Sequence, residues 1–141
     1  MRMILATLVI FSAIALGVLA AQNKPRIKHV PLSPTSAASG EEMFTTYCAV
    51  CHGVDGKGGG PAAAALKTTP ANLTQLSVKN GGTYPEPHVV QILTAGTLLA
   101  HGSADMPVWG DLFKSLNGGS QSMANMRVAN LTAYIKSIQG K

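Results

Sequence analysis

This chain has only two cysteines, and they lie three residues apart, which limits the cofactors that it can bind. Cys48 and Cys51 are followed at once by His52, so the segment has the pattern C-x-x-C-H. Residues three apart on a helix share a face, so the two thiols can reach the two vinyl groups along one edge of a porphyrin. The next residue then directs an imidazole towards the iron. The pattern is typical of covalent c-type haem attachment.

Other uses of a C-x-x-C pair need a context that is not evident here. A thioredoxin-type dithiol needs a βαβ unit, and the sequence shows no strand-like alternation. A structural zinc site needs four ligands, but the remaining histidines, His29, His88 and His101, are dispersed along the chain. Haem attachment is therefore the preferred interpretation, and a dithiol centre stays the alternative.

Residues 1–21 have the pattern of an export signal. Arg2 precedes an uncharged apolar run at 4–20, and small residues offer a cleavage site near Gln22. The run is also close to the length of a membrane span, about 20 residues. The segment is therefore either a cleaved signal peptide or an N-terminal anchor that tethers the protein through residues 4–20. Both alternatives place the rest of the chain in the periplasm or facing it, because Arg2 stays inside.

The rest of the chain divides into a linker and one domain. Residues 22–38 contain Pro25, Pro31 and Pro34 amid serine, threonine and lysine, which predicts an extended linker. Residues 39–141 are predicted to form a single domain. A domain of roughly 100 residues buries only about two-thirds of its unfolded surface, and aromatic residues make up 5% of this chain. A large apolar cofactor would therefore strengthen its core.

Helical periodicity dominates the predicted domain, which indicates an all-α fold. Ser39 and Glu42 form a capping-box pattern that opens a helix, and Gly53 is predicted to end it. The last helix is predicted to begin at Ser122. Its apolar stripe consists of Val128, Leu131, Tyr134, Ile135 and Ile138.

Shorter elements are predicted between these two helices. One helical segment begins at Pro61, a second follows Asn72 as its cap, and a third begins at Pro87. Gly96 is predicted to end the third segment. The stretch 97–117 is predicted to be irregular.

The charge of the chain limits its partners. The formal net charge is +5, and the lysines and arginines are scattered without a basic run interleaved with aromatic residues. Nucleic acid is therefore not an expected partner. Mild basicity of this kind suits docking to an acidic redox protein.

Over residues 39–139, the sequence resembles the single-haem class I cytochromes c of bacterial respiratory chains. The motifs that carry the resemblance are GEEMF (40–44), CAVCHG (48–53), GKGGGP (56–61), PANL (70–73), MPVWG (106–110) and LTAYI (131–135). The resemblance implies a small cytochrome c-like fold, with a few helices wrapped around one covalently bound haem. It implies that the first and last helices cross near Gly40, Phe44, Leu131 and Tyr134.

The resemblance also implies the ligands of the haem iron. His52 would be the proximal ligand, with the carbonyl of Pro61 accepting a hydrogen bond from its other ring nitrogen. A downstream methionine would be the distal ligand, and Met106 is the candidate. Pro107 disfavours helix at Met106, and a soft thioether donor favours ferrous iron and so raises the reduction potential. A core methionine and a bis-histidine site using His101 are the alternatives.

These features predict an electron carrier rather than an enzyme. The protein would carry single electrons on one haem c with His52 and Met106 as axial ligands. It would act as a free-standing protein or as the cytochrome subunit of a respiratory complex, with a membrane oxidase or dehydrogenase as its redox partner. A haem with an open sixth site, which could bind a gas or reduce peroxide, and a periplasmic thiol oxidoreductase are the competing predictions.

Overall fold

The computed structural model describes residues 32–95 and 106–140, and these residues form helices and loops without a strand. The predicted all-α fold class is confirmed. The predicted leader and most of the predicted linker lie outside the described residues. In chain order the elements are α2 (Gly40–Met43), η1 (Phe44–Cys48), α3 (Ala49–His52), η2 (Ala63–Ala65), η3 (Leu73–Gln75), α4 (Leu76–Lys79), α5 (Glu86–Ala95), α6 (Trp109–Leu116) and α7 (Gln121–Ser137). Within the described ranges, no helix is both long and apolar enough to cross a membrane.

The first helical segment begins at the predicted cap and ends at the predicted glycine. The Ser39 hydroxyl accepts a hydrogen bond of 3.1 Å from the backbone N–H of Glu42. The Glu42 carboxylate accepts from the backbone N–H of Ser36, so only half of the expected capping box forms. The segment ends after His52, where Gly53 takes a φ of 78° that favours glycine.

A π-helical turn, η1, joins α2 to α3. Its closing hydrogen bond runs from the Ala49 N–H to the Phe44 carbonyl, one residue longer than an α-helical bond. The extra residue rotates the part of the helix that follows. Phe44, Tyr47 and Cys48 are all buried, and Cys51 is half-buried. Turns of this kind are frequent at functional sites, and this one precedes the C-x-x-C-H segment.

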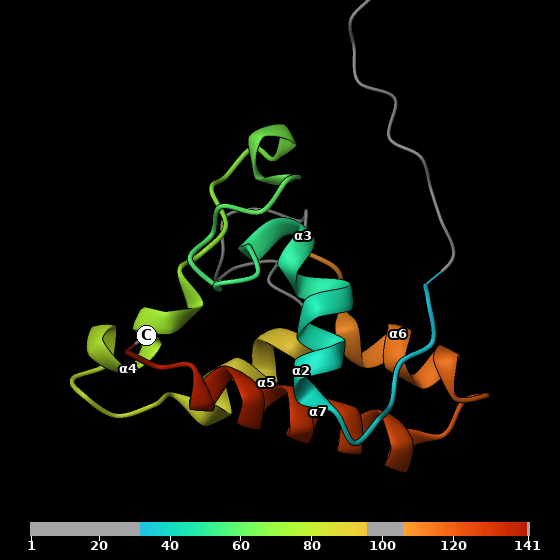
Figure 1. The fold of residues 1–141 in the computed structure, drawn as a ribbon. Coiled ribbons are helices and arrows are strands. Elements are labelled where there is room, and N and C mark those ends of the chain that lie inside the picture. The colour runs from blue at the N-terminus through green and yellow to red at the C-terminus, as the bar shows by residue number, and fades with distance from the viewer. Residues whose placement is uncertain (1–31, 96–105, 141) are drawn as a thin grey trace, which may run out of the picture. The chain divides into compact units, whose positions relative to one another are not determined.

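The first and last helices cross, as the resemblance to class I cytochromes c implies. Figure 1 shows α2 lying against α7. A Cβ atom on Gly40 would collide with the backbone carbonyl oxygen of Asn130 and with Cβ of Tyr134, so only glycine permits this approach. The rings of Phe44 and Tyr134 pack with their centroids 5.2 Å apart, and Leu131 is fully buried beside them.

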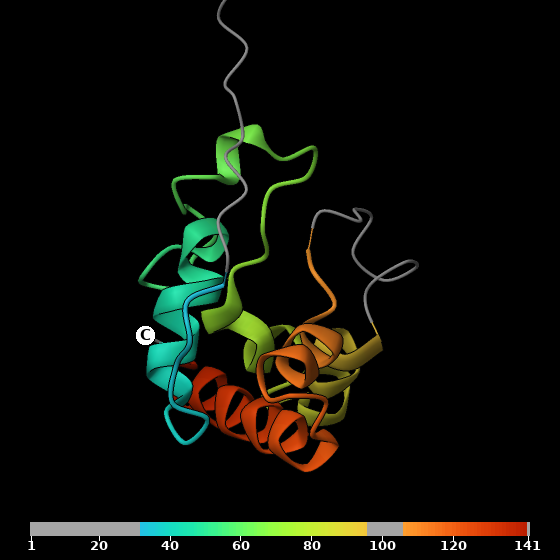
Figure 2. The same ribbon diagram turned by 90° about the vertical axis from the view of Figure 1, so that its right-hand side faces the viewer.

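The prediction that residues 97–117 are irregular is wrong for its second half. There α6 forms, because Trp109 and Phe113 lie one helical turn apart and are both buried. Figure 2 shows α5 and α6 beside each other and against α7. At the contact, a Cβ on Gly110 would lie 3.1 Å from Cα of Thr94.

The other predicted starts differ by small shifts. α7 begins at Gln121, one residue before the prediction, because the hydroxyl of Ser120 caps it. α5 begins at Glu86, which places Pro87 in its first turn. The helical segment that is predicted to begin at Pro61 forms only the single 3₁₀ turn η2.

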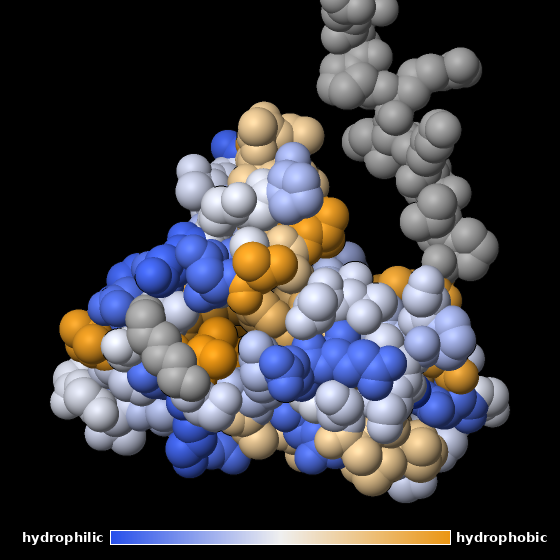
Figure 3. All heavy atoms as spheres, viewed as in Figure 1, coloured by the Kyte–Doolittle hydropathy of each residue, from blue (hydrophilic) through white to orange (hydrophobic). Residues whose placement is uncertain are grey.

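Figure 3 shows weakly hydrophobic atoms over this projecting turn. Asn72 caps η3 as predicted, by accepting from the N–H of Thr74.

Residues 33–38, which composition alone assigns to the linker, pack against the domain. Thr35 and Ala37 are buried. Asn130 donates its side-chain amide to the carbonyl of Ala37 at 2.8 Å, and Arg127 holds Thr35 through two hydrogen bonds. These contacts come from side chains more than 90 positions away, so local composition does not reveal them.

Candidate functional site

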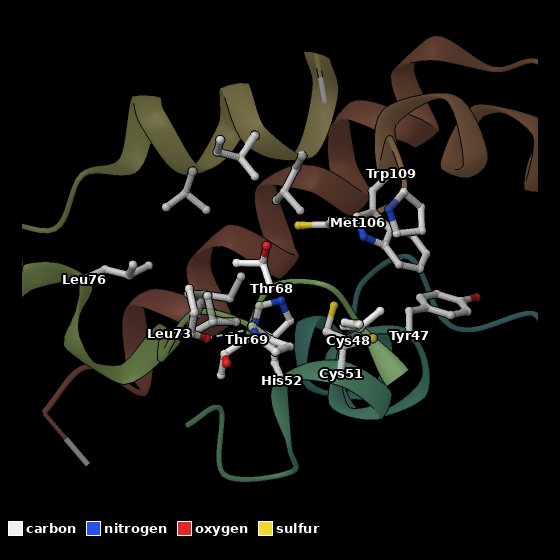
Figure 4. Close-up of a pocket in the computed structure, with 18 of the residues that line it drawn as sticks. Tyr47, Cys48, Cys51, His52, Thr68, Thr69, Leu73, Leu76, Met106 and Trp109 are labelled. Carbon is white, nitrogen blue, oxygen red and sulfur yellow. Dashed lines mark hydrogen bonds between the residues drawn. The ribbon is translucent and has the colours of Figure 1, made fainter. Parts of the chain in front are cut away.

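The four predicted site residues line one pocket. Cys48, Cys51 and His52 reach it from the end of the first helical segment, and Met106 reaches it from the residues just before α6. In Figure 4, the sulfur of Met106 and the imidazole of His52 point into the pocket from opposite sides. Most of the wall is apolar and includes Leu66, Leu73, Leu76, Val89, Ile92 and Leu93.

A hydrogen bond orients the His52 ring. Its Nδ1 lies 2.9 Å from the carbonyl oxygen of Ala71. Since a carbonyl only accepts, Nδ1 carries the proton, and Nε2 is the nitrogen with which this ring would bind a metal. The prediction that the carbonyl of Pro61 accepts this hydrogen bond is therefore wrong. Pro61 lies in a turn against α3, where the N–H of Ala62 donates to Val50, while the segment containing Ala71 passes the histidine.

The glycine-rich loop after Gly53 fixes the end of α3. The backbone N–H groups of Gly58 and Gly60 donate to the carbonyls of His52 and Cys51 at 2.7 and 3.0 Å. These carbonyls would otherwise lack helical partners. A Cβ on Gly60 would collide with backbone atoms of α3, so this close contact needs glycine. The loop supports the backbone of the motif and does not line the pocket.

The two cysteines face the pocket without a disulfide between them. Burial, with a smaller effect of nearby Cys51, raises the pKa of the Cys48 thiol to about 12. Reactive dithiol centres have the opposite property, because a lowered pKa supplies their nucleophilic thiolate. The environment of Cys48 therefore disfavours the thiol oxidoreductase.

Aromatic packing holds the segment that carries Met106. Met106 is half-buried, and Pro107 and Val108 lead from it into α6. Trp109, the first residue of α6, stacks on Tyr47 with ring centroids 5.4 Å apart. Trp109 therefore both lines the pocket and packs in the core. His101, the alternative ligand, lies outside the described residues.

The pocket has the donors and the lining that a c-type haem requires. Two thiols three residues apart suit thioether bonds to one edge of the macrocycle, and an imidazole and a thioether suit its iron. The surrounding leucine, isoleucine and valine side chains suit its apolar faces. Elsewhere in the described residues, no cluster of three or more His, Cys, Asp or Glu side chains is arranged to hold a metal ion.

An all-helical fold around an apolar pocket that contains a C-x-x-C-H segment defines the class of small single-haem cytochromes c. The family model for "Cytochrome C oxidase, cbb3-type, subunit III" matches residues 35–135. The chain belongs to this family, and its cytochrome c domain implies electron transfer by a covalent c-type haem. No curated protein and no solved structure gave a significant match to the chain.

Proposed function

We propose that this protein carries single electrons on one haem c, bound through thioethers to Cys48 and Cys51, with His52 and Met106 as its axial ligands. The observation that carries the proposal is that all four side chains line one apolar pocket. The imidazole and the thioether enter that pocket from opposite sides, as two axial ligands must (Figure 4).

When bound, the haem supplies reversible one-electron chemistry at its iron. The residues of this chain do the rest. The hydrogen bond to Ala71 holds the imidazole of His52 in one orientation, and such a bond makes the ligand more basic. The thioether of Met106 favours the ferrous state. The leucine, isoleucine and valine side chains exclude water, which limits the rearrangement that accompanies each electron.

We further propose that the protein works outside the cytoplasm, as a free carrier or as a subunit of a respiratory complex. The predicted signal peptide or anchor at residues 1–21 supports export. A formal net charge of +5 suits an acidic docking partner, such as an acidic face of a membrane oxidase or dehydrogenase. In neither form does the protein itself make or break bonds of a substrate.

Expression of the whole gene with haem-attachment machinery tests the proposal. The mature protein should gain the mass of one haem and show the sharp reduced-minus-oxidised bands of a c-type cytochrome. The ferric form should show the far-red band of methionine ligation. A colourless protein without added mass would contradict haem attachment. Copurification with a membrane oxidase would favour the subunit over the free carrier.

A further inference from the structure

Arg127 places a positive charge inside the fold. It lies on α7, and only 4% of its surface is exposed. A guanidinium stays protonated in proteins, and burying such a charge is costly unless it is paired or hydrogen-bonded. Among the described residues, the one ion pair joins Lys136 to Glu86, so no carboxylate pairs with Arg127 there. A buried cation without a counter-ion requires a reason.

A directed chain of hydrogen bonds leads from this cation to the pocket wall. Arg127 donates Nη1 to the hydroxyl of Thr35 at 2.8 Å and Nη2 to the Thr35 carbonyl at 2.7 Å. The hydroxyls of Thr35 and Tyr47 are 3.0 Å apart. Since the Tyr47 hydroxyl donates its proton to the carbonyl of Ser33, the Thr35 hydroxyl must donate to Tyr47. The guanidinium of Arg127, the hydroxyl of Thr35 and the hydroxyl of Tyr47 therefore each donate to the next group along the chain, and this common direction strengthens each hydrogen bond.

Tyr47, which accepts a hydrogen bond from Thr35 in this chain, is also part of the candidate haem site. Tyr47 lines the pocket together with Trp109, and Figure 4 shows both beside Cys48 and Met106. Phe113 completes the aromatic cluster, with its ring 5.9 Å from that of Tyr47. The guanidinium of Arg127 lies over the outer side of this cluster, 5.8 Å from the ring centroid of Phe113. Arg127 therefore contacts the pocket wall indirectly, through Phe113 and Thr35, each of which contacts Tyr47.

We propose that the buried positive charge of Arg127 raises the reduction potential of the haem. The inference rests on the proposed haem function. Reduction lowers the net charge of the site by one, so a fixed positive charge nearby favours the reduced state. Buried charges act over longer distances than surface charges, because water and salt screen them less. The hydrogen bonds to Thr35 fix the distance of the charge from the pocket.

The first test compares Arg127→Met with Arg127→Lys in the haem-loaded protein, by spectroelectrochemical titration of the midpoint potential. Arg127→Met removes the charge and should lower the equilibrium constant for reduction threefold to tenfold, where a tenfold change corresponds to about 59 mV for one electron. Arg127→Lys loses the paired hydrogen bonds but keeps the charge, so its potential should stay close to that of the wild type. An equal decrease of the midpoint potential in the two variants would overturn the proposal, because Arg127 would then act only through its hydrogen bonds.

The second test keeps Arg127 and so does not depend on folding of the methionine variant. Thr35→Asp places a carboxylate beside the guanidinium and neutralises the charge of Arg127. Thr35→Asn is the control, because asparagine has the size and polarity of aspartate but no charge. The aspartate variant should have the lower potential. Equal potentials in this pair would also overturn the proposal. Haem mass and spectrum are measured for every protein, so a wild type without haem would contradict the proposed function rather than the role of Arg127.

Discussion

At the scale of single residues, the local backbone directs the sulfur and nitrogen atoms of four side chains towards the pocket. Cys48 is the last residue of η1 and Cys51 lies in α3, one residue before its end, and both side chains line the pocket. The Ala71 carbonyl accepts a hydrogen bond from Nδ1 of His52 and so orients the ring. Met106 precedes Pro107, which keeps its segment out of the helix that follows.

Replacing Cys51 with alanine should leave at most one thioether and sharply reduce stable haem attachment. Two thiols spaced three residues apart are needed to hold both vinyl positions of one macrocycle edge. The measurement is the mass of the denatured protein together with the yield of covalently bound haem. Normal yields of doubly linked haem in Cys51→Ala would contradict the assignment.

Replacing Met106 with alanine should open the sixth coordination position and lower the reduction potential, because the soft thioether that favours ferrous iron is lost. The far-red band should disappear, and carbon monoxide should bind rapidly to the ferrous protein. Met126, which is 40% exposed on α7, provides the control. Met126→Ala should keep both band and potential. An unchanged potential in Met106→Ala would remove Met106 from the site.

At the scale of elements, two packing arrangements hold the pocket. The crossing of α2 and α7 fixes the helix that carries the cysteines, and Gly40 makes the crossing possible. The aromatic cluster on α6 fixes the segment that carries Met106, because Trp109 and Phe113 pack against Tyr47. The positions of the two proposed axial ligands, His52 and Met106, therefore depend on separate contacts that meet at Tyr47.

Gly40→Ala should destabilise the fold by about 1–3 kcal/mol, the usual cost of forcing an extra carbon into a packed contact. In an exposed helix the same change would stabilise, since alanine is the better helix former. The measurement is the free energy of unfolding in denaturant. Gly59, where a Cβ would meet nothing within 4 Å, is the matched control, and Gly59→Ala should be nearly neutral. A neutral Gly40→Ala would mean that the helices do not approach so closely.

At the scale of the whole molecule, a haem bound in the apolar pocket would add to the core. Leu66, Leu73 and Leu76 line the pocket and remain half-buried. Each would gain apolar burial against a macrocycle, at roughly 25 cal/mol per Å² removed from water. This agrees with the low aromatic content of the chain, which is 5%.

The same chain made without haem-attachment machinery should therefore melt at a lower temperature than the haem-loaded protein. In a domain of about 100 residues, each kcal/mol corresponds to a shift of about 4–8 °C. Thermal unfolding followed by far-ultraviolet circular dichroism measures the difference, and no substitution is needed. Equal melting temperatures would show that haem does not add to the burial of these leucines.

Much of this fold follows from local pattern. Ser39 and Asn72 cap helices because a serine or asparagine side chain can accept from a backbone N–H two or three residues ahead. The structure forms α6 where the sequence predicts an irregular stretch, because Trp109 and Phe113 pack in the core at helical spacing once the chain has passed Pro107. The burial of Arg127 is not predicted either, although Arg127 lies between the apolar positions of the last helix, because an arginine side chain is normally exposed.

The site chemistry follows from the sequence alone, because haem attachment through two thioethers and ligation of its iron need two thiols and an imidazole at a short fixed spacing along one helix. The helical class also follows from the sequence alone, since helix caps and apolar periodicity are properties of neighbouring residues. Three features depend on long-range packing: Ala71 orients His52, the segment around Thr35 joins the domain, and Arg127 is buried against Phe113. These contacts link residues 19 and 92 positions apart, and their formation depends on how the helices cross, which local pattern does not encode.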